Sequence, residues 1–265
     1  MKKNKNISIK TEKEIEIMKE GGRILAWVMA EIIKAVKPGV KTIELDHLAE
    51  QLIKKNGGQS SFKTVPKYYW TTCLCVNDCI VHGIPNQYQL KENDLLTIDV
   101  GNFYQGFHTD MARTLCVRTQ NSKLKTQNSK EIDRFLETGK MALRKAIEQA
   151  KIGNRIGHIS KAIDETIEGA GYSVVKTLVG HGVGRKLHEP PQIPCFLKGK
   201  IEETPVLKRG VTLAVEVIYN QGTDQVFIKK NDRWSVFTKD GKLSGLFENT
   251  IAITSQGPMV LTELG

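Results

Sequence analysis

The stretch "LLTIDVGNFYQGFHTDMART", residues 95–114, decides the fold. Two aspartates, Asp99 and Asp110, stand in apolar segments typical of buried β-structure, with a turn signal at "NFYQGF" between them. A hairpin that turns there brings the two carboxylates side by side. An ionised carboxylate inside an apolar sheet is costly unless positive charge pairs with it. We therefore expect a β-hairpin whose two acids share a cationic partner.

The composition is that of an ordinary globular protein. Of 265 residues, 40% are apolar and 26% charged, which predicts one domain over residues 1–265. No apolar run is long enough to cross a membrane, and the N-terminus lacks the apolar core of a secretion signal. Five cysteines, an odd number, favour reduced thiols over a disulfide framework, so we expect a cytoplasmic protein. The cluster "CLCVNDC" is interpreted as small apolar strand residues, because no second Cys/His pair at zinc-finger spacing accompanies it.

The net charge is +10, mostly from lysine. Such a charge attracts nucleic acid or a ribosomal surface without specificity. No aromatic-interleaved RNA motif or recognition helix accompanies it, so we expect no specific nucleic-acid binding. A solvated lysine-rich surface is the favoured interpretation, and electrostatic association with the ribosome stays open.

Two halves of the chain resemble each other, about residues 10–118 and 131–260, with a polar linker expected at "TQNSKLKTQNSK" (119–130) between them. The block "AVKPGVKTIELDHLAEQLIKKNGG" (35–58) aligns with "QAKIGNRIGHISKAIDETIEGAGY" (149–172). Gly39 meets Gly153 and Gly57 meets Gly171. Each block predicts a helix end, a glycine turn and an amphipathic helix.

The repeat continues into the acidic strands. "LKENDLLTIDV" (90–100) aligns with "LKRGVTLAVEV" (207–217), so that Asp99 falls on Glu216. A second strand in each half adds one more acid, Asp110 and Glu248, and upstream each half has a His-Gly pair at 82–83 and 181–182. One unit used twice and facing itself brings these four carboxylates and two imidazoles together at a pseudo-two-fold axis.

Four carboxylates in an apolar sheet point to metal ions. Like charges raise each other's pKa, so the acids cannot all stay ionised without cations. Carboxylates with an imidazole suit manganese, iron, cobalt or zinc, and this many acids indicate two ions that share bridging carboxylates. The alternative, solvated acids on exposed strands, conflicts with the apolar runs on both sides of each acid.

Five motifs carry a resemblance to a known family: "CVNDCIVHGIP", "TIDVGNFYQGFHTD", "GHGVGRKLHEPP", "LAVEVIYN" and "LFENTIAIT". Their order and spacing resemble those of the type I methionine aminopeptidases, from about residue 10 to the end. The resemblance implies an α+β pita-bread fold, a pseudo-two-fold curved antiparallel sheet covered by helices, with a dinuclear metal site within. It implies a cytoplasmic, monomeric metallo-aminopeptidase that removes the initiator methionine from nascent proteins whose second residue is small and uncharged.

The resemblance also assigns roles to residues. It implies five ligands for two divalent ions: Asp99 on one ion, Asp110 and Glu248 bridging, and His181 and Glu216 on the second ion. His82 and His188 correspond to two histidines that hold the substrate's peptide group and steady the tetrahedral intermediate. Glu216 is expected to carry a proton from the attacking water to the leaving amine. The resemblance leaves the identity of the metal open.

A pocket for the methionine side chain needs apolar walls that tolerate sulfur. By resemblance Tyr68, Cys73 and Trp234 line it; Phe62 is a weaker candidate, with ordinary core packing as the alternative. Three positions depart from the family pattern: Leu187 replaces an aromatic residue, Val217 a proline and Asn249 a histidine. None of these is a ligand, so we expect changes in ligand support and pocket shape rather than in the reaction.

Two other functions fit parts of the pattern. An Xaa-Pro peptidase on the same fold shares the five ligands but usually carries a further N-terminal domain, for which this chain has no room. A non-catalytic, ribosome-associated binding protein on the pita-bread scaffold is expected to have lost ligands, and here all five are present.

Overall fold

A ten-stranded antiparallel sheet forms the centre of the protein in the computed structural model, which describes residues 7–119 and 127–264. Its main path runs through β1 (Gln59–Ser60), β4 (Leu95–Tyr104), β5 (Phe107–Cys116), β12 (Ser244–Thr254), β9 (Thr212–Asn220), β7 (Val179–Gly182) and β8 (Glu189–Pro194). Three strands extend it: β2 (Thr72–Val76) on β4, β6 (Ser173–Val174) on β9, and β13 (Gly257–Val260) on β12. A smaller sheet joins β10 (Val226–Ile228), β11 (Val236–Thr238) and β3 (Cys79–Val81).

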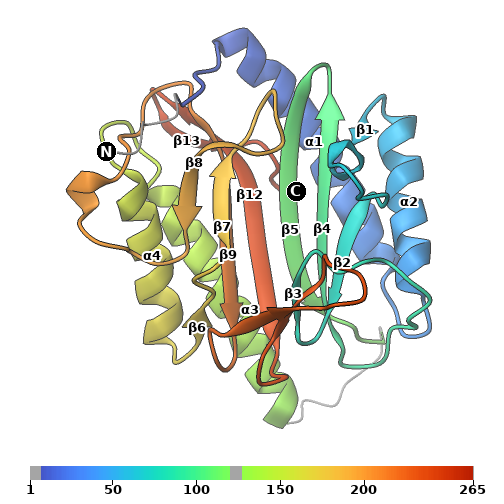
Figure 1. Cartoon of the computed structure of the whole chain (residues 1–265). Helices are drawn as coiled ribbons and strands as arrows, with labels where there is room; N and C mark the ends of the chain where they lie inside the picture. The colour runs from blue at the N-terminus through green and yellow to red at the C-terminus, as the bar shows by residue number, and fades with distance from the viewer. Residues whose placement is uncertain (1–6, 120–126, 265) are drawn as a thin grey trace.

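Helices cover one face of the sheet, as Figure 1 shows. α1 (Glu12–Ala35) packs on β4 and β5, and α2 (Thr42–Lys55) packs against α1 and β2. In the second half α3 (Gln127–Glu148) packs on β12 and β9, and α4 (Ile156–Gly169) packs on α3. Two short 3-10 helices, η1 (Phe62–Thr64) and η2 (Ile201–Glu203), lie in the connections. Among the described residues no helix is long and apolar enough to cross a membrane.

The internal repeat predicted from the sequence is present in three dimensions. α2 and α4 each have 14 residues and occupy the same positions of the two aligned blocks. The apolar residues of one buried stripe coincide as well, with Leu45, Ala49 and Ile53 of α2 against Ile159, Ile163 and Ile167 of α4. The predicted pseudo-two-fold antiparallel sheet covered by helices is therefore confirmed.

The hairpin expected at residues 95–114 is also confirmed. β4 and β5 pair from Leu95↔Cys116 to Tyr104↔Phe107. The two connecting residues, Gln105 and Gly106, have positive φ of 46° and 88°, as a type I′ turn requires.

The expected polar linker is shorter than predicted at its C-terminal end. α3 begins at Gln127, so the prediction was wrong for residues 127–130, whereas residues 120–126 lie outside the described part of the chain. Ile132, Phe135 and Leu136 of α3 are buried. One further helical turn places Ser129, three residues before Ile132, on that same buried side, where it is 8% exposed. Because Ser129 is polar although its position is buried, the apolar period of the sequence did not indicate the first turn of the helix.

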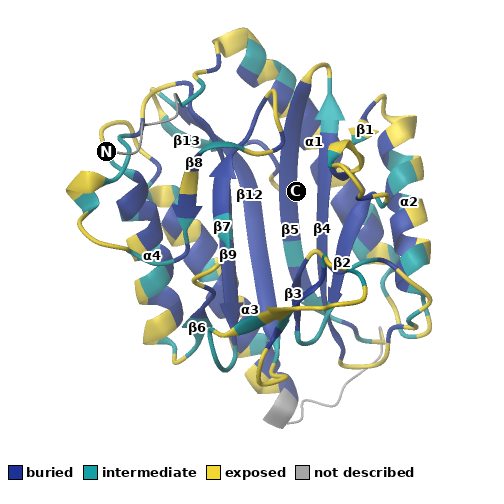
Figure 2. Ribbon diagram, viewed as in Figure 1, coloured by how far each residue is buried: buried dark blue, intermediate teal, exposed yellow. Residues whose placement is uncertain are grey.

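The two faces of the central strands have different chemistry. On β12, Phe247, Ile251 and Ile253 pack into the core with α3 and α4. Leu246, Glu248 and Thr250 alternate with them and therefore point to the other face. Figure 2 shows the central strands buried along almost their whole length, with exposed residues on the connecting loops and on the helices. The acids thus lie on the buried face of the sheet that the helices do not cover.

Candidate metal centre

The acids form a row across four neighbouring strands. Glu216 on β9 lies opposite Glu248 on β12, Glu248 lies opposite Ala112 on β5, and Ala112 lies opposite Asp99 on β4. Residues directly opposite each other in a ladder project to the same face, and so does a residue two positions along a strand. Asp110, two residues before Ala112, therefore joins the row. The pairing of the strands gathers all four predicted carboxylates on one face.

His181 enters this group from β7. It lies opposite Ala214, which is two residues before Glu216 on β9. Its Nδ1 is 2.9 Å from the carbonyl oxygen of Gly182, which can only accept, so Nδ1 carries the hydrogen. The other nitrogen, Nε2, lies 3.5 Å from Oε1 of Glu216. Burial lowers the pKa of His181 to about 4, and a neutral imidazole with a free Nε2 lone pair is the form that binds metal ions.

The donor set fits divalent cations. Asp110, His181 and Glu248 each place one ligand atom within 4.8 Å of the others. One buried oxygen each of Asp99, Asp110 and Glu248 has no hydrogen-bond partner among the described residues. Burial, with the neighbouring carboxylates, raises the pKa of Asp110 and Glu248, and burial raises that of Asp99 to about 7. Bound cations offset this cost, and carboxylate oxygens with an imidazole are ligands that first-row transition metals accept.

Neighbouring polar groups hold the two central acids in place. The Thr250 hydroxyl accepts from the backbone N–H of Asp110 and donates to its carbonyl, both at 2.8 Å. The Arg113 guanidinium donates to the carbonyl of Glu248 at 2.5 Å and to Oδ1 of Asn249 at 2.9 Å. The Asn249 amide in turn donates to the carbonyl of Thr262 at 2.6 Å. Asn249, one of the departures from the family pattern, is thus fully engaged behind Glu248.

Above the acids lies a cavity of about 180 Å³. It brings together all ten predicted site residues, Tyr68, Cys73, His82, Asp99, Asp110, His181, His188, Glu216, Trp234 and Glu248. Phe62, the weaker candidate, and Leu187 line it too. Sequence reasoning missed Val65, Val81 and Leu246. Alternation along the strand could have found Leu246, which lies two residues before Glu248 and so shares its face.

The apolar wall of the cavity is a packed aromatic cluster. The Tyr68 ring meets that of Trp234 edge to face at 5.2 Å and that of Phe62 at 6.3 Å between centroids. The Tyr68 hydroxyl donates to the carbonyl of Thr72 at 2.8 Å and lies 3.2 Å from Sγ of Cys73. Leu187 is 6% exposed and packs in the same cluster. The wall therefore offers hydrocarbon, aromatic rings and one thiol, with no charge.

Two histidines border the cavity without joining the acid row. His82 has φ of 57°, a left-handed conformation that is uncommon outside glycine and often found at functional sites. Its side chain is open to solvent, yet the surrounding protein lowers its pKa to about 4, first by desolvation and then by the proximity of His188. The His188 ring lies 4.4 Å from that of His181, and burial lowers its pKa too. Because both pKa values are lowered, both imidazoles favour the neutral form, which can donate one hydrogen bond.

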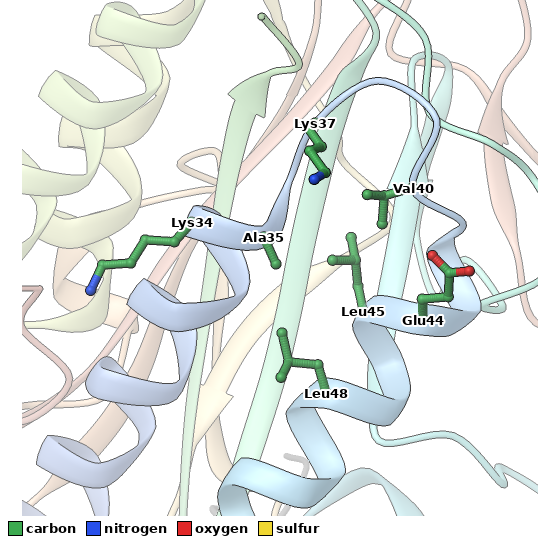
Figure 3. Close-up of a pocket in the computed structure, with 7 residues that line it drawn as sticks. All are labelled: Lys34, Ala35, Lys37, Val40, Glu44, Leu45 and Leu48. Carbon is green, nitrogen blue, oxygen red and sulfur yellow. The ribbon is translucent and has the colours of Figure 1, made fainter. Parts of the chain in front are cut away.

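A second cavity, of about 320 Å³, lies between the end of α1 and the start of α2. Figure 3 shows its lining residues, Lys34, Ala35, Lys37, Val40, Glu44, Leu45 and Leu48. They include a single carboxylate and no histidine. This cavity has none of the convergent acids and imidazoles of the first.

Known proteins show the same organisation. Residues 16–255 match the model of "Metallopeptidase family M24". The chain belongs to this family. Within M24 it is 42% identical to the methionine aminopeptidase 1 of Bacillus subtilis, over 97% of this chain and 100% of that relative. The crystal structure of the methionine aminopeptidase from Thermotoga maritima superposes with a TM-score of 0.90 at 38% identity, over 97% of this chain and 100% of that one. The predicted pita-bread fold and the resemblance to methionine aminopeptidases are confirmed.

Solved structures of prolidases fit less well. The prolidase from Pyrococcus horikoshii superposes with a TM-score of 0.73 at 25% identity. The match covers 97% of this chain but only 64% of the prolidase. The methionine aminopeptidases, in contrast, match from end to end.

Proposed function

We propose that this metallopeptidase removes the initiator methionine from nascent proteins whose second residue is small and uncharged. One observation carries the proposal: four acids and a histidine line one side of a cavity whose opposite wall is apolar and uncharged, in a chain that methionine aminopeptidases match over 97% of its length. A free N-terminal methionine offers the groups that such a site can hold, an unbranched thioether and a peptide bond one residue from the chain end.

Five residues hold two divalent ions in this proposal. Asp99 would hold one ion, His181 and Glu216 would hold the other, and Asp110 and Glu248 would serve both. One buried oxygen each of Asp99, Asp110 and Glu248 has no hydrogen-bond partner in the described part of the chain, which supports the assignment. When bound, the ions act as Lewis acids that activate the attacking water and polarise the scissile carbonyl. Cobalt, manganese, iron and zinc are all compatible with the donor set.

The chain's own groups bind the substrate and move protons. His82 and His188 hold the scissile peptide and donate hydrogen bonds to the oxygen that becomes negative in the tetrahedral intermediate. Glu216 accepts a proton from the attacking water and delivers it to the leaving amine. Tyr68, Cys73 and Trp234 enclose the methionine side chain, with Phe62 and Leu187 completing the wall.

The location and partners follow from this role. The enzyme acts as a monomer in the cytoplasm, on N-termini emerging during translation. Its charge of +10 favours electrostatic contact with the ribosome, without specific nucleic-acid recognition.

Turnover of a Met-Ala-Ser peptide by metal-reconstituted enzyme tests the proposal. The chain is stripped of metal, reloaded separately with cobalt, manganese, iron or zinc, and assayed with Met-Ala-Ser and Ala-Pro peptides. We expect Met-Ala-Ser to be the better substrate with every active metal. Faster hydrolysis of Ala-Pro would assign the chain to the Xaa-Pro peptidases, and no turnover of either peptide would favour a non-catalytic binding protein.

A further inference from the structure

A buried ion pair joins the N-terminal segment to the loop that carries His188. Nζ of Lys10 donates to Oε2 of Glu189 at 2.5 Å, and the two side chains are 1% and 7% exposed. Among the ion pairs of the described residues, this is the only one between a Lys or Arg and a carboxylate that is buried on both sides. A buried pair of charges is costly to form, so its presence calls for a specific role.

The surrounding backbone is shaped to admit Lys10. A Cβ added to Gly184 would lie 2.2 Å from Cε of Lys10, so only glycine leaves room for the side chain. Gly210, with φ of 84°, accepts the backbone N–H of Lys10 at 2.7 Å, and a Cβ there would lie 2.5 Å from the carbonyl oxygen of Lys10. Both the side chain and the backbone of Lys10 are therefore fixed by close contacts.

Glu189 connects the fixed Lys10 side chain to the loop that carries His188. Its second oxygen accepts the backbone N–H of Lys186 at 3.0 Å, so both carboxylate oxygens are used. The carbonyl of Gly184 accepts the backbone N–H of His108 on β5 at 2.7 Å. Residues 184–189 are thus held at both ends, and the two residues just before Glu189 are Leu187 and His188, which both face the cavity.

We propose that Lys10 is a positioning residue for His188 and Leu187. It neutralises Glu189 inside the protein and so fixes the loop that presents both side chains to the substrate. This inference rests on the proposed function, because it concerns how His188 acts on the peptide and how Leu187 bounds the pocket. Lys10 itself does not line the cavity and does not contact substrate.

The test uses Lys10→Met in wild-type and His188→Ala backgrounds of the whole, metal-loaded enzyme. A displaced hydrogen-bond donor weakens transition-state binding, so we expect Lys10→Met to lower kcat by roughly ten- to a hundredfold with a smaller change in KM. Metal content should stay that of the wild type. In the His188→Ala background the same substitution should lower kcat by less than about twofold. The effects of two residues that act through one group are not additive.

Arg185→Met is the matched control. Arg185 lies in the same loop and pairs with Glu14 on the surface. An exposed ion pair contributes little, so kcat should stay within about twofold of the wild type. Should Lys10→Met fail to fold, judged by circular dichroism, the double variant Lys10→Met with Glu189→Gln replaces it in both backgrounds. It leaves no unpaired buried charge.

Three results would overturn the inference: equal fold losses in the two backgrounds, loss of bound metal, or a kcat as little affected as in the control. A further readout is the ratio of kcat/KM for Met-Ala-Ser over Leu-Ala-Ser, which should fall because Leu187 moves with the loop. Failure of the wild-type enzyme to hydrolyse Met-Ala-Ser would instead reject the proposed function, so the two failures are distinguishable.

Discussion

The two halves of the molecule share their helices and acidic strands but differ in how those strands are joined. In the first half β4 and β5 are joined by the two residues Gln105 and Gly106. In the second half β9 and β12 are joined by residues 221–243, which contain β10 and β11. β11 pairs with β3 of the first half, directly before His82. The longer connection thus crosses from one half to the other.

Because of this difference, the metal centre and the apolar pocket are built from different parts of the chain. The shared parts supply the acid row, in which Asp99 and Asp110 correspond to Glu216 and Glu248. The added connection supplies Trp234, whose backbone N–H donates to Oδ1 of Asp232 at 2.9 Å. Ser235 donates to Oδ2 of Asp232 at 2.8 Å, so a tight turn fixes the tryptophan. In the proposed function the repeat builds the site for the ions, and the connection that departs from the repeat builds one wall for the methionine side chain.

The largest expected effect concerns the two bridging acids, one from each half. Asp110→Asn and Glu248→Gln each remove a charge that both ions share, so we expect each to abolish two-metal binding and turnover alike. Metal content and kcat on Met-Ala-Ser measure this. Asp133→Asn, an exposed acid paired with Arg118, is the control and should leave both unchanged. A bridging variant that kept two tightly bound ions and wild-type activity would show the ligand assignment to be wrong.

The next effect concerns the two cavity histidines. His82→Ala and His188→Ala should keep both ions and lower kcat by about 10²–10³-fold, or roughly 2.7–4 kcal/mol, as for other donors to a developing oxyanion. The metal content of each variant distinguishes a hydrogen-bond donor from a metal ligand. If either variant loses its ions, that histidine is a ligand, and the correspondence between the halves changes.

The sequence predicted the shared parts well and the connection poorly. The alignment of Asp99 with Glu216 was visible because each acid interrupts an apolar strand that lies downstream of an amphipathic helix, 44 residues after α2 and 47 residues after α4. The sequence alone could not place Arg113 behind Glu248, because that contact joins β5 to β12 and depends on their register. The pairing of β11 with β3 is likewise a contact between distant segments, and the local sequence pattern does not predict it. Trp234 was found only through the family resemblance.

A smaller effect concerns the pocket wall. Leu187 stands where the resemblance to methionine aminopeptidases implies an aromatic residue, so we expect that wall to be smaller and more flexible. Changes of about one methylene in contact are worth roughly 1–3 kcal/mol of discrimination. We expect methionine to stay preferred, with leucine and norleucine cleaved at a smaller penalty than in relatives that carry the aromatic. Leu187→Phe should increase the ratio of kcat/KM for Met-Ala over Leu-Ala, and a Met-Lys peptide should stay a poor substrate of both enzymes. An unchanged ratio would mean that Leu187 does not set the selectivity.

The smallest effect tests whether the halves are equivalent in energy as well as in shape. Gly39 and Gly153 occupy the same turn of the two blocks, with φ of 91° and 88°. A Cβ added to either meets nothing within 4 Å, so alanine there is disfavoured only by the left-handed backbone. We expect Gly39→Ala and Gly153→Ala to lower the free energy of unfolding in urea by about 1–2 kcal/mol each, and by equal amounts. Gly169, at the end of α4, has equally free space and no positive φ, so Gly169→Ala should instead raise stability by roughly 0.5–1 kcal/mol. Unequal losses at the two turns would show that only one half depends on its glycine, and that the repeat is one of geometry alone.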